Sequence, residues 1–90
     1  MIKNVKVTTR FFRKFKRLGA DEKAAALEEI ALFKEDPFYS SLDTHSLKDR
    51  LKGFYSFSVL PNLRIMFRFT NSGQTEVLFY DIGSHEIYLS

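Results

Sequence analysis

Residues 54–69, FYSFSVLPNLRIMFRF, carry the pattern that decides the fold. Apolar and polar side chains alternate on both sides of a Pro-Asn pair, and this period of two indicates half-buried β-strands. Pro61 and Asn62 favour a turn, so the two halves are expected to pair as antiparallel strands. Residues 75–82, TEVLFYDI, follow the turn-forming NSGQ at 71–74 and are apolar enough for a central strand.

The chain before this stretch predicts one strand and two helices. Residues 2–8, IKNVKVT, alternate as a short strand does. A helix is expected after Thr8 or Thr9, either of which can cap it, and Gly19 is expected to end it as a C-cap. Its apolar residues recur at helical spacing: Phe11, Phe12, Phe15 and Leu18. A second helix is expected over residues 20–36, stopped by Pro37, with an apolar stripe of Ala24, Leu27, Ile30, Ala31 and Phe33.

Residues 45–53, HSLKDRLKG, also alternate and predict a further strand. Leu47 and Leu51 would lie on one side of it, and Lys48, Arg50 and Lys52 on the other. The order is then β-α-α-β-β-β, with residues 45–53 as a fourth strand in the second half if they pair. This order indicates an α+β fold in which two N-terminal helices pack on one face of a small, mainly antiparallel sheet. Residues 1–90 are expected to form one domain.

Composition excludes several classes of protein. The chain has no cysteine, so a disulfide scaffold or a thiolate metal site is excluded and a reducing compartment fits. No segment approaches the roughly 18 to 20 apolar residues of a membrane span, and the start lacks the apolar core of a secretion signal. The two histidines lie far apart with few acids nearby, which is a poor metal site. We therefore expect a cytoplasmic protein with no membrane contact, no metal and no cofactor.

The net charge of +3 is unevenly distributed along the chain. Residues 1–20 hold seven Lys or Arg and no acid, residues 21–36 hold six acids against two lysines, and residues 45–70 are again basic. By alternation, the sheet face away from the helices would be cationic and uncovered, and such a face suits a phosphate backbone. Solvated surface charge is the alternative. The basic run of the first helix is expected to be solvated unless a ribosome or an acidic partner covers it.

Two segments, LKGFYSFSVLPNLRIMFRF at 51–69 and VLFYDIGSHEIY at 77–88, resemble the RelE/ParE superfamily of toxins from bacterial type II toxin–antitoxin pairs, especially its RelE- and YafQ-like branches. The resemblance covers most of the chain, and the joint order of its short motifs carries it. It implies a cytoplasmic, metal-free endoribonuclease that cleaves mRNA, often on the ribosome, and forms small oligomers with a cognate antitoxin that wraps it. The ParE branch instead poisons DNA gyrase and lacks catalytic residues.

The resemblance also implies site residues. Metal-free RNA cleavage needs a base for the 2′-OH, an acid for the leaving 5′ oxygen and cations for the developing charge. His45 and His85 match two histidines of the YafQ-like pattern, but Ser58 and Asn62 stand where that pattern has a second histidine and an aspartate. RelE-like members use lysines, arginines and a C-terminal tyrosine instead. Tyr88 lies near the expected place, although closer to His85 than expected, so the match to both patterns is partial.

The expected catalytic residues are therefore His85 as general acid or base, Arg64 as phosphate stabiliser, Tyr88 and His45. The expected RNA-binding residues are Lys48, Arg50, Lys52 and Arg68. Structural roles are the alternative: His45 could start a strand and bind a loop carbonyl, and Tyr88 could pack the chain end. For the whole protein, the alternatives are a non-enzymatic gyrase inhibitor and a degenerate member that only binds its antitoxin.

Overall fold

The computed structural model describes residues 1–89 and contains a five-stranded sheet with two α-helices. The strands are β1 (Asn4–Val7), β2 (His45–Ser46), β3 (Tyr55–Leu60), β4 (Leu63–Phe69) and β5 (Glu76–Gly83). The helices are α1 (Thr9–Lys16) and α2 (Ala20–Glu35), and short 3₁₀ turns are η1 (Ser40–Leu42), η2 (Asp49–Leu51) and η3 (His85–Leu89). No helix within residues 1–89 is long and apolar enough to cross a membrane.

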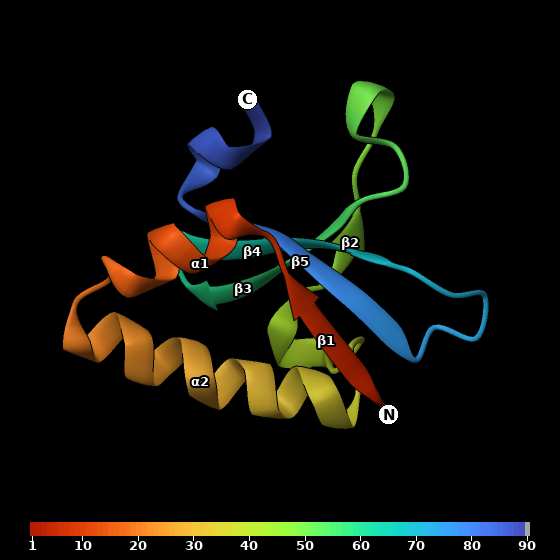
Figure 1. Ribbon diagram of the computed structural model, residues 1–90, viewed down its shortest axis with the longest axis horizontal. Coiled ribbons are helices and arrows are strands. Elements are labelled where there is room, and N and C mark those ends of the chain that lie inside the picture. Colours follow the sequence, from red (N-terminus) through yellow and green to blue (C-terminus); the bar gives the residue numbers. More distant parts are fainter. Residues whose placement is uncertain (90) are drawn as a thin grey trace.

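The sheet order is β1-β5-β4-β3-β2. β1 runs parallel to β5, and the other neighbours are antiparallel. The two helices return the chain from β1 to the opposite edge of the sheet, where β2 begins the antiparallel strands (Figure 1). The most apolar strand, β5, lies inside the sheet between β1 and β4, as its composition predicted. The predicted α+β class is confirmed.

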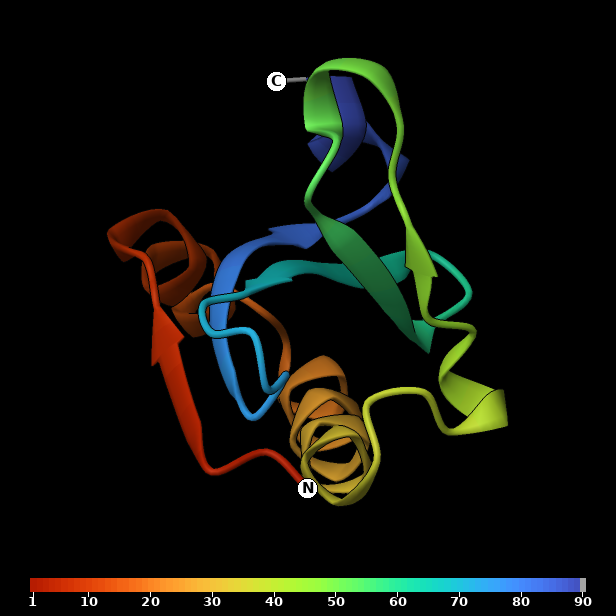
Figure 2. The same ribbon diagram turned by 90° about the vertical axis from the view of Figure 1, so that its right-hand side faces the viewer.

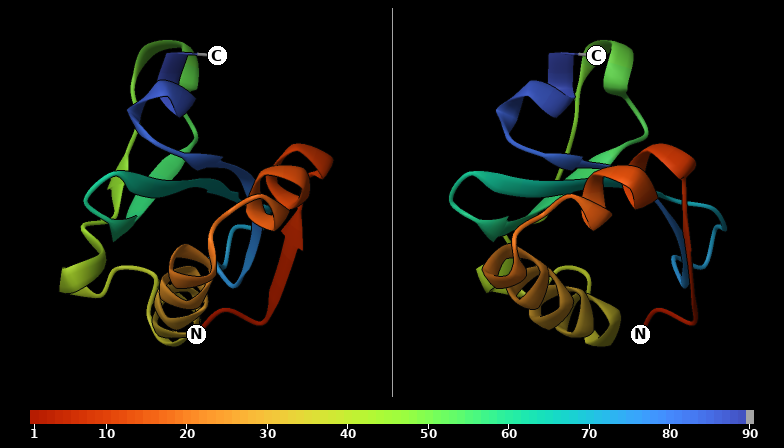
Figure 3. Two further views of the ribbon diagram at one scale, coloured as in Figure 1. Left: turned by 90° about the vertical axis from the view of Figure 1, so that its left-hand side faces the viewer. Right: turned by 60° about the vertical axis from the view of Figure 1, so that its left-hand side comes forward.

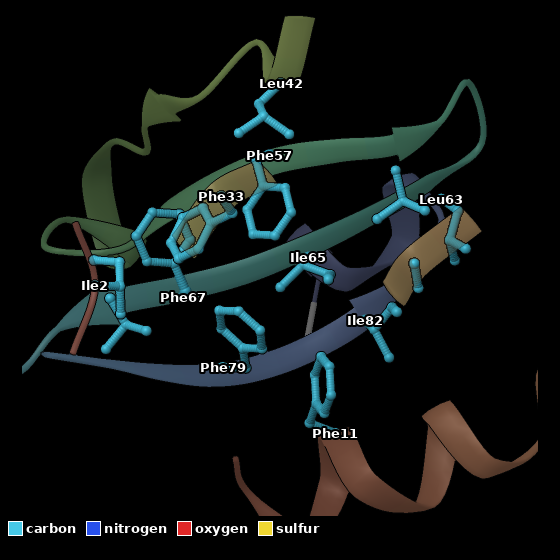
Figure 4. Close-up of a cluster of buried hydrophobic side chains, with 13 residues drawn as sticks. Ile2, Phe11, Phe33, Leu42, Phe57, Leu63, Ile65, Phe67, Phe79 and Ile82 are labelled. Atoms are coloured by element: carbon cyan, nitrogen blue, oxygen red, sulfur yellow. The ribbon is translucent and has the colours of Figure 1, made fainter. Parts of the chain in front are cut away.

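The core lies between the sheet and α2, which crosses one sheet face (Figure 2). Phe33 of α2 stacks on Phe57 with ring centroids 4.5 Å apart and meets Phe67 edge-on at 4.8 Å. Phe11 of α1 enters the same core against Phe79, at 5.4 Å (Figure 4). The alternation of β3 and β4 predicted which residues are buried: Phe57, Val59, Leu63, Ile65 and Phe67.

The helix boundaries differ from the predicted ones. Thr8 caps α1, its hydroxyl accepting a hydrogen bond from the Phe11 amide, but the helix ends at Lys16 rather than at Gly19. Gly19 instead precedes α2, in an extended conformation, and its amide donates to the Glu22 carboxylate. The predicted stripe of α2 was also partly wrong, because alanines on all sides of the helix make the pattern ambiguous. Its buried residues are Ala26 and Phe33, with Ile30 half-buried, whereas Ala24, Leu27 and Ala31 are exposed.

The predicted strand over residues 45–53 was wrong beyond its first two residues. After β2 the chain leaves the sheet, and Asp49 and Gly53 have positive φ angles of 58° and 97°, which no strand accommodates. Leu47 and Leu51 are half-buried and outside the core cluster. The cations of this segment therefore lie on a projecting loop with η2 at its tip and do not form a stripe on the sheet (Figure 1).

The sheet face opposite α2 was predicted to be uncovered, and this was wrong. η3 folds back onto that face (Figure 3). Ile87 is only 1% exposed and packs so closely that a Cβ built on Gly83 would lie 2.8 Å from its Cγ2. Met66 and Ser56, which alternation places on this face, are buried as well. Burial of Ile87 therefore covers the middle of this face, and only its flanks remain open to solvent.

Candidate functional site

Strand register places two of the predicted site residues, His45 and Arg64, in neighbouring rows on the face opposite α2. His45 is paired with Ser56, and Ser56 with Met66. Ser58 is paired with Arg64, and Arg64 with Gly83. Directly paired residues of antiparallel strands share a face of the sheet. His45 and Arg64 therefore lie on the same side of the sheet, in adjacent rows.

His85 reaches this side because η3 begins two residues after Gly83. A 3₁₀ turn has three residues per turn, so residues i and i+3 point in the same direction. The rings of His85 and Tyr88 accordingly contact each other edge-on, with centroids 5.4 Å apart. His85 is exposed and Tyr88 is half-buried. The structure thus places an exposed imidazole two residues beyond Gly83, the register partner of Arg64 on β4.

Tyr88 is held from two sides. Its hydroxyl donates a 2.8 Å hydrogen bond to Ser56 Oγ, and its carbonyl accepts a 2.9 Å bond from the Arg50 guanidinium. Arg50 lies on η2, so these bonds join the projecting loop, β3 and the chain end. Because Ser56 is fully buried, the tyrosine hydroxyl is fixed by a rigid strand. Tyr88 therefore orients the turn that carries His85.

Arg64 is half-buried and donates from Nη1 to Ser58 Oγ at 3.1 Å. Within residues 1–89 it has no carboxylate within 4.0 Å. A guanidinium has five N–H donors, so several remain for another anion. Ser58, which stands where the YafQ-like pattern has a histidine, therefore has a different role here, because it fixes the side chain of an arginine.

The remaining predicted residues are less closely gathered. His45 is exposed, with Nδ1 3.0 Å from the Asp43 carbonyl, which is the structural role that the sequence left open. Lys48 and Lys52 flank η2 and are exposed. Arg68 lies on the same strand face as Arg64, but four residues further along, or about 13 Å. It is exposed and paired with Leu78, away from His85.

Sequence reasoning missed Asp81, a carboxylate only 2% exposed on the same side of the sheet. Lys14 of α1 donates to it at 2.7 Å, and Arg10 Nη1 lies 3.8 Å from its other oxygen. Part of the basic run of α1 is therefore paired inside the protein rather than simply solvated. The signal in the sequence was an aspartate within an apolar strand, since buried charges need partners.

The arrangement can transfer a proton and stabilise negative charge. His85 is an exposed imidazole, a group that can take or give a proton, and Arg64 and Arg50 bring two guanidinium groups to the same side of the sheet. No three His, Asp or Glu side chains within residues 1–89 lie close enough together to hold a metal ion.

No protein-family model matches the sequence, and no curated protein matches it. Solved toxin structures share its fold. The YoeB/ParE toxin from Agrobacterium tumefaciens is 19% identical, with 92% of this chain and 99% of that chain covered and a TM-score of 0.78. A chain of the toxin–antitoxin complex RelBE2 from Mycobacterium tuberculosis is 20% identical, with 94% and 100% covered and a TM-score of 0.75. YafQ from Escherichia coli is 16% identical over the whole of both chains, with a TM-score of 0.68. The chain has the fold of RelE/ParE-like toxins, as the resemblance implied.

Proposed function

We propose that the chain is the toxin of a type II toxin–antitoxin pair and cleaves mRNA without a metal, on the ribosome, in the cytoplasm. The observation that carries this proposal is that the turn bearing His85 and Tyr88, whose rings are in contact, begins two residues after Gly83, the register partner of Arg64. The His85 imidazole is exposed and Arg64 has no carboxylate partner within residues 1–89, so both side chains are available to a ligand. The shared fold with RelE- and YafQ-type toxins supports the same reading.

The proposed reaction is attack of a ribose 2′ oxygen on the adjacent phosphorus. The bond from the 2′ oxygen to phosphorus forms, the bond from phosphorus to the 5′ oxygen breaks, and a proton passes from the 2′-OH to the leaving oxygen. His85 takes or gives that proton. Arg64 stabilises the charge that develops on the phosphoryl oxygens. His45 assists from the neighbouring row, and Arg50, Lys48, Lys52 and Arg68 hold the RNA backbone.

The partner that restrains this activity would be a cognate antitoxin. One of the solved relatives is a toxin–antitoxin complex, which supports such a partner for this chain. The exposed cations of the η2 loop and of β4 suit an acidic or amphipathic antitoxin segment. Toxin and antitoxin would then form a small hetero-oligomer in which the site is covered.

A gyrase inhibitor without catalytic activity is the second candidate. Ser58 and Asn62 favour it, because neither is a base at neutral pH and they stand where the YafQ-like pattern has a histidine and an aspartate. Asn62 lies in the exposed turn between β3 and β4. Under this reading, His85 would have no part in toxicity.

The His85→Ala variant separates the two candidates. Primer extension on message from translating ribosomes should show cleavage reduced by about 10²- to 10⁴-fold, the usual loss when a general acid or base is removed. The exposed imidazole contributes little burial, so the fold and antitoxin binding should be unchanged and serve as controls. If the wild type arrests growth without cleaved message, and His85→Ala arrests it equally well, the ribonuclease proposal fails in favour of gyrase.

A further inference from the structure

A second basic surface lies on the other side of η3. Here a pocket of about 480 Å³ opens between α1, the end of β5 and η3. Figure 3 shows α1 and the C-terminal turn on the same side of the molecule, above the level of α2. The charged residues that line the pocket are Arg10, Arg13, Lys14, Arg17, Asp81 and Glu86. We call it the α1 pocket.

The cations of the α1 pocket share one face of α1. Their spacing of i, i+3, i+4 and i+7 from Arg10 places them in one row along the helix. Phe11 and Phe15 lie on the other side of α1 and pack into the core. The amphipathic helix thus has an apolar face toward the core and a cationic face toward η3. This orientation concentrates the positive charge of the helix in one concave surface instead of distributing it around the helix.

The charge of the pocket is not balanced by its own residues. Four cations against two carboxylates leave a formal charge of +2. The carboxylate of Asp81 is already paired inside the protein, with Lys14 Nζ at 2.7 Å and Arg10 Nη1 at 3.8 Å. Within residues 1–89, Arg13 and Arg17 have no hydrogen-bonded or ion-paired side-chain partner, and Glu86 has no ion pair. Two guanidinium groups in the pocket therefore remain available to an anion.

The geometry of η3 places the α1 pocket next to the candidate site. With three residues per turn, successive side chains point in three directions. His85 and Tyr88 face the site, Ile87 faces the sheet, and Glu86 lines the pocket. The two basic surfaces therefore lie on different faces of the same 3₁₀ turn. An RNA strand bound at His85 would reach Arg13 and Arg17 by crossing η3.

Aromatic side chains beside the pocket favour nucleic acid over an acidic protein segment. The guanidinium of Arg10 lies 5.8 Å from the centre of the Tyr80 ring, and Tyr80 contacts Phe54 with centroids 5.1 Å apart. Both rings are half-buried, so part of each is open to solvent. Arginine next to aromatic rings is the combination that holds single-stranded nucleic acid, by its phosphates and by base stacking.

We propose that the α1 pocket binds a phosphate of single-stranded RNA adjacent to the phosphate at His85, through Arg13 and Arg17. The identity of the ligand rests on the proposed ribonuclease function, but the binding is measured without cleavage. The pocket would fix the direction in which the strand crosses η3. It would add affinity that is independent of base sequence, because phosphate contacts carry no sequence information.

The test uses a single-stranded RNA oligonucleotide with 2′-O-methyl groups, which cannot be cleaved, and fluorescence anisotropy over a range of salt. The variant Arg13→Ala/Arg17→Ala should bind it roughly tenfold more weakly at low salt, and the slope of log K against log salt should fall by roughly 1.4, or 0.7 for each lost phosphate contact. Lys16→Ala/Lys34→Ala removes the same charge from exposed positions outside the pocket and should change binding little. Glu86→Gln should strengthen binding.

The outcomes separate this proposal from the proposed function. If the wild type binds and cleaves RNA and the arginine variant binds as tightly as the charge-matched control, the pocket proposal is wrong while the ribonuclease stands. If the arginine variant loses binding but no message is cleaved by the wild type, the pocket stands and the ribonuclease fails. Loss of binding to a polyglutamate peptide, with RNA binding intact, would assign the pocket to an acidic protein and overturn the proposal. A wild type that binds no RNA overturns it as well.

Discussion

Asp81 shows how one residue couples the core to the functional face. Its carboxylate is buried between β5, α1 and η3, where it also accepts a hydrogen bond from the Ile82 amide at 2.8 Å. A buried carboxylate is tolerated only with partners, because removing a charge from water is costly. Lys14 is the shorter contact, and Arg10 is longer and nearly half exposed. The position of α1 against the sheet therefore depends on an ion pair as well as on Phe11.

Replacing Lys14 with methionine tests this coupling. The change keeps an unbranched side chain one atom shorter than lysine but leaves Asp81 with only the distant Arg10 as a charged partner, so the free energy of unfolding at neutral pH should fall by about 1–3 kcal/mol. The estimate lies below that for a fully buried pair because the Lys14 side chain is 35% exposed. Urea denaturation measures it, with Lys16→Met as the exposed control on the same helix. Equal midpoints for the two variants would show that the pair contributes nothing.

Among the elements, η3 determines the site. Ile87 anchors it on the sheet, its amide donates to the Ser84 carbonyl at 3.1 Å, and Tyr88 and Arg50 fix its far end. A five-residue turn has too few internal hydrogen bonds to be stable alone, so its order comes from these contacts. His85 is positioned only as long as Ile87 stays against Gly83.

Gly83→Ala should displace the turn. The added Cβ would lie 2.8 Å from Ile87 Cγ2 and 3.1 Å from Lys14 Nζ, and a β-branched side chain cannot easily move its methyl group away. We expect about 1–3 kcal/mol of destabilisation from overpacking, faster hydrogen exchange at the Ile87 amide, and weaker cleavage, while the β3–β4 core remains protected. Gly73→Ala is the matched control, because its Cβ would meet only Asn71 at 3.7 Å. Unchanged exchange at Ile87 in Gly83→Ala would contradict this role.

For the whole molecule, the features that could be predicted from the sequence are those that follow from the alternation of apolar and polar side chains along a single strand. Alternation over residues 54–69 identified the core face of β3 and β4, since each strand buries every second side chain against α2. The loop at 47–54 was mistaken for a strand because alternation continued there while positive φ at Asp49 and Gly53 turned the chain away. The sequence predicted His85 and Arg64 as site residues, which stays a prediction, but it did not predict the contact of Asp81 with Lys14, which are 67 positions apart. Contacts of that range come only from tertiary packing.

The arrangement of the helices and loops around the sheet determines how charge is distributed over the surface. α2, which holds most of the acidic residues of the segment 21–36, lies on one side of the sheet, and the η2 loop projects on the other (Figure 2). The cationic face of α1 is turned toward η3, on the side away from α2. The molecule therefore has two electrostatically different sides. An acidic partner is attracted to one side and repelled by the other, which favours a single mode of docking.

Binding of the proposed antitoxin should accordingly weaken as salt increases. Between about 0.05 M and 0.5 M salt, where the Debye length falls from more than 10 Å to less than 5 Å, we expect the dissociation constant to rise about tenfold or more. Isothermal titration of the purified pair measures this dependence. Lys48→Ala/Lys52→Ala should reduce it, because both side chains are exposed on the η2 loop, whereas Lys23→Ala/Lys34→Ala on α2 should leave it intact. An affinity that stays flat across this range of salt would mean that the antitoxin is held by apolar contacts and that the basic side serves RNA alone.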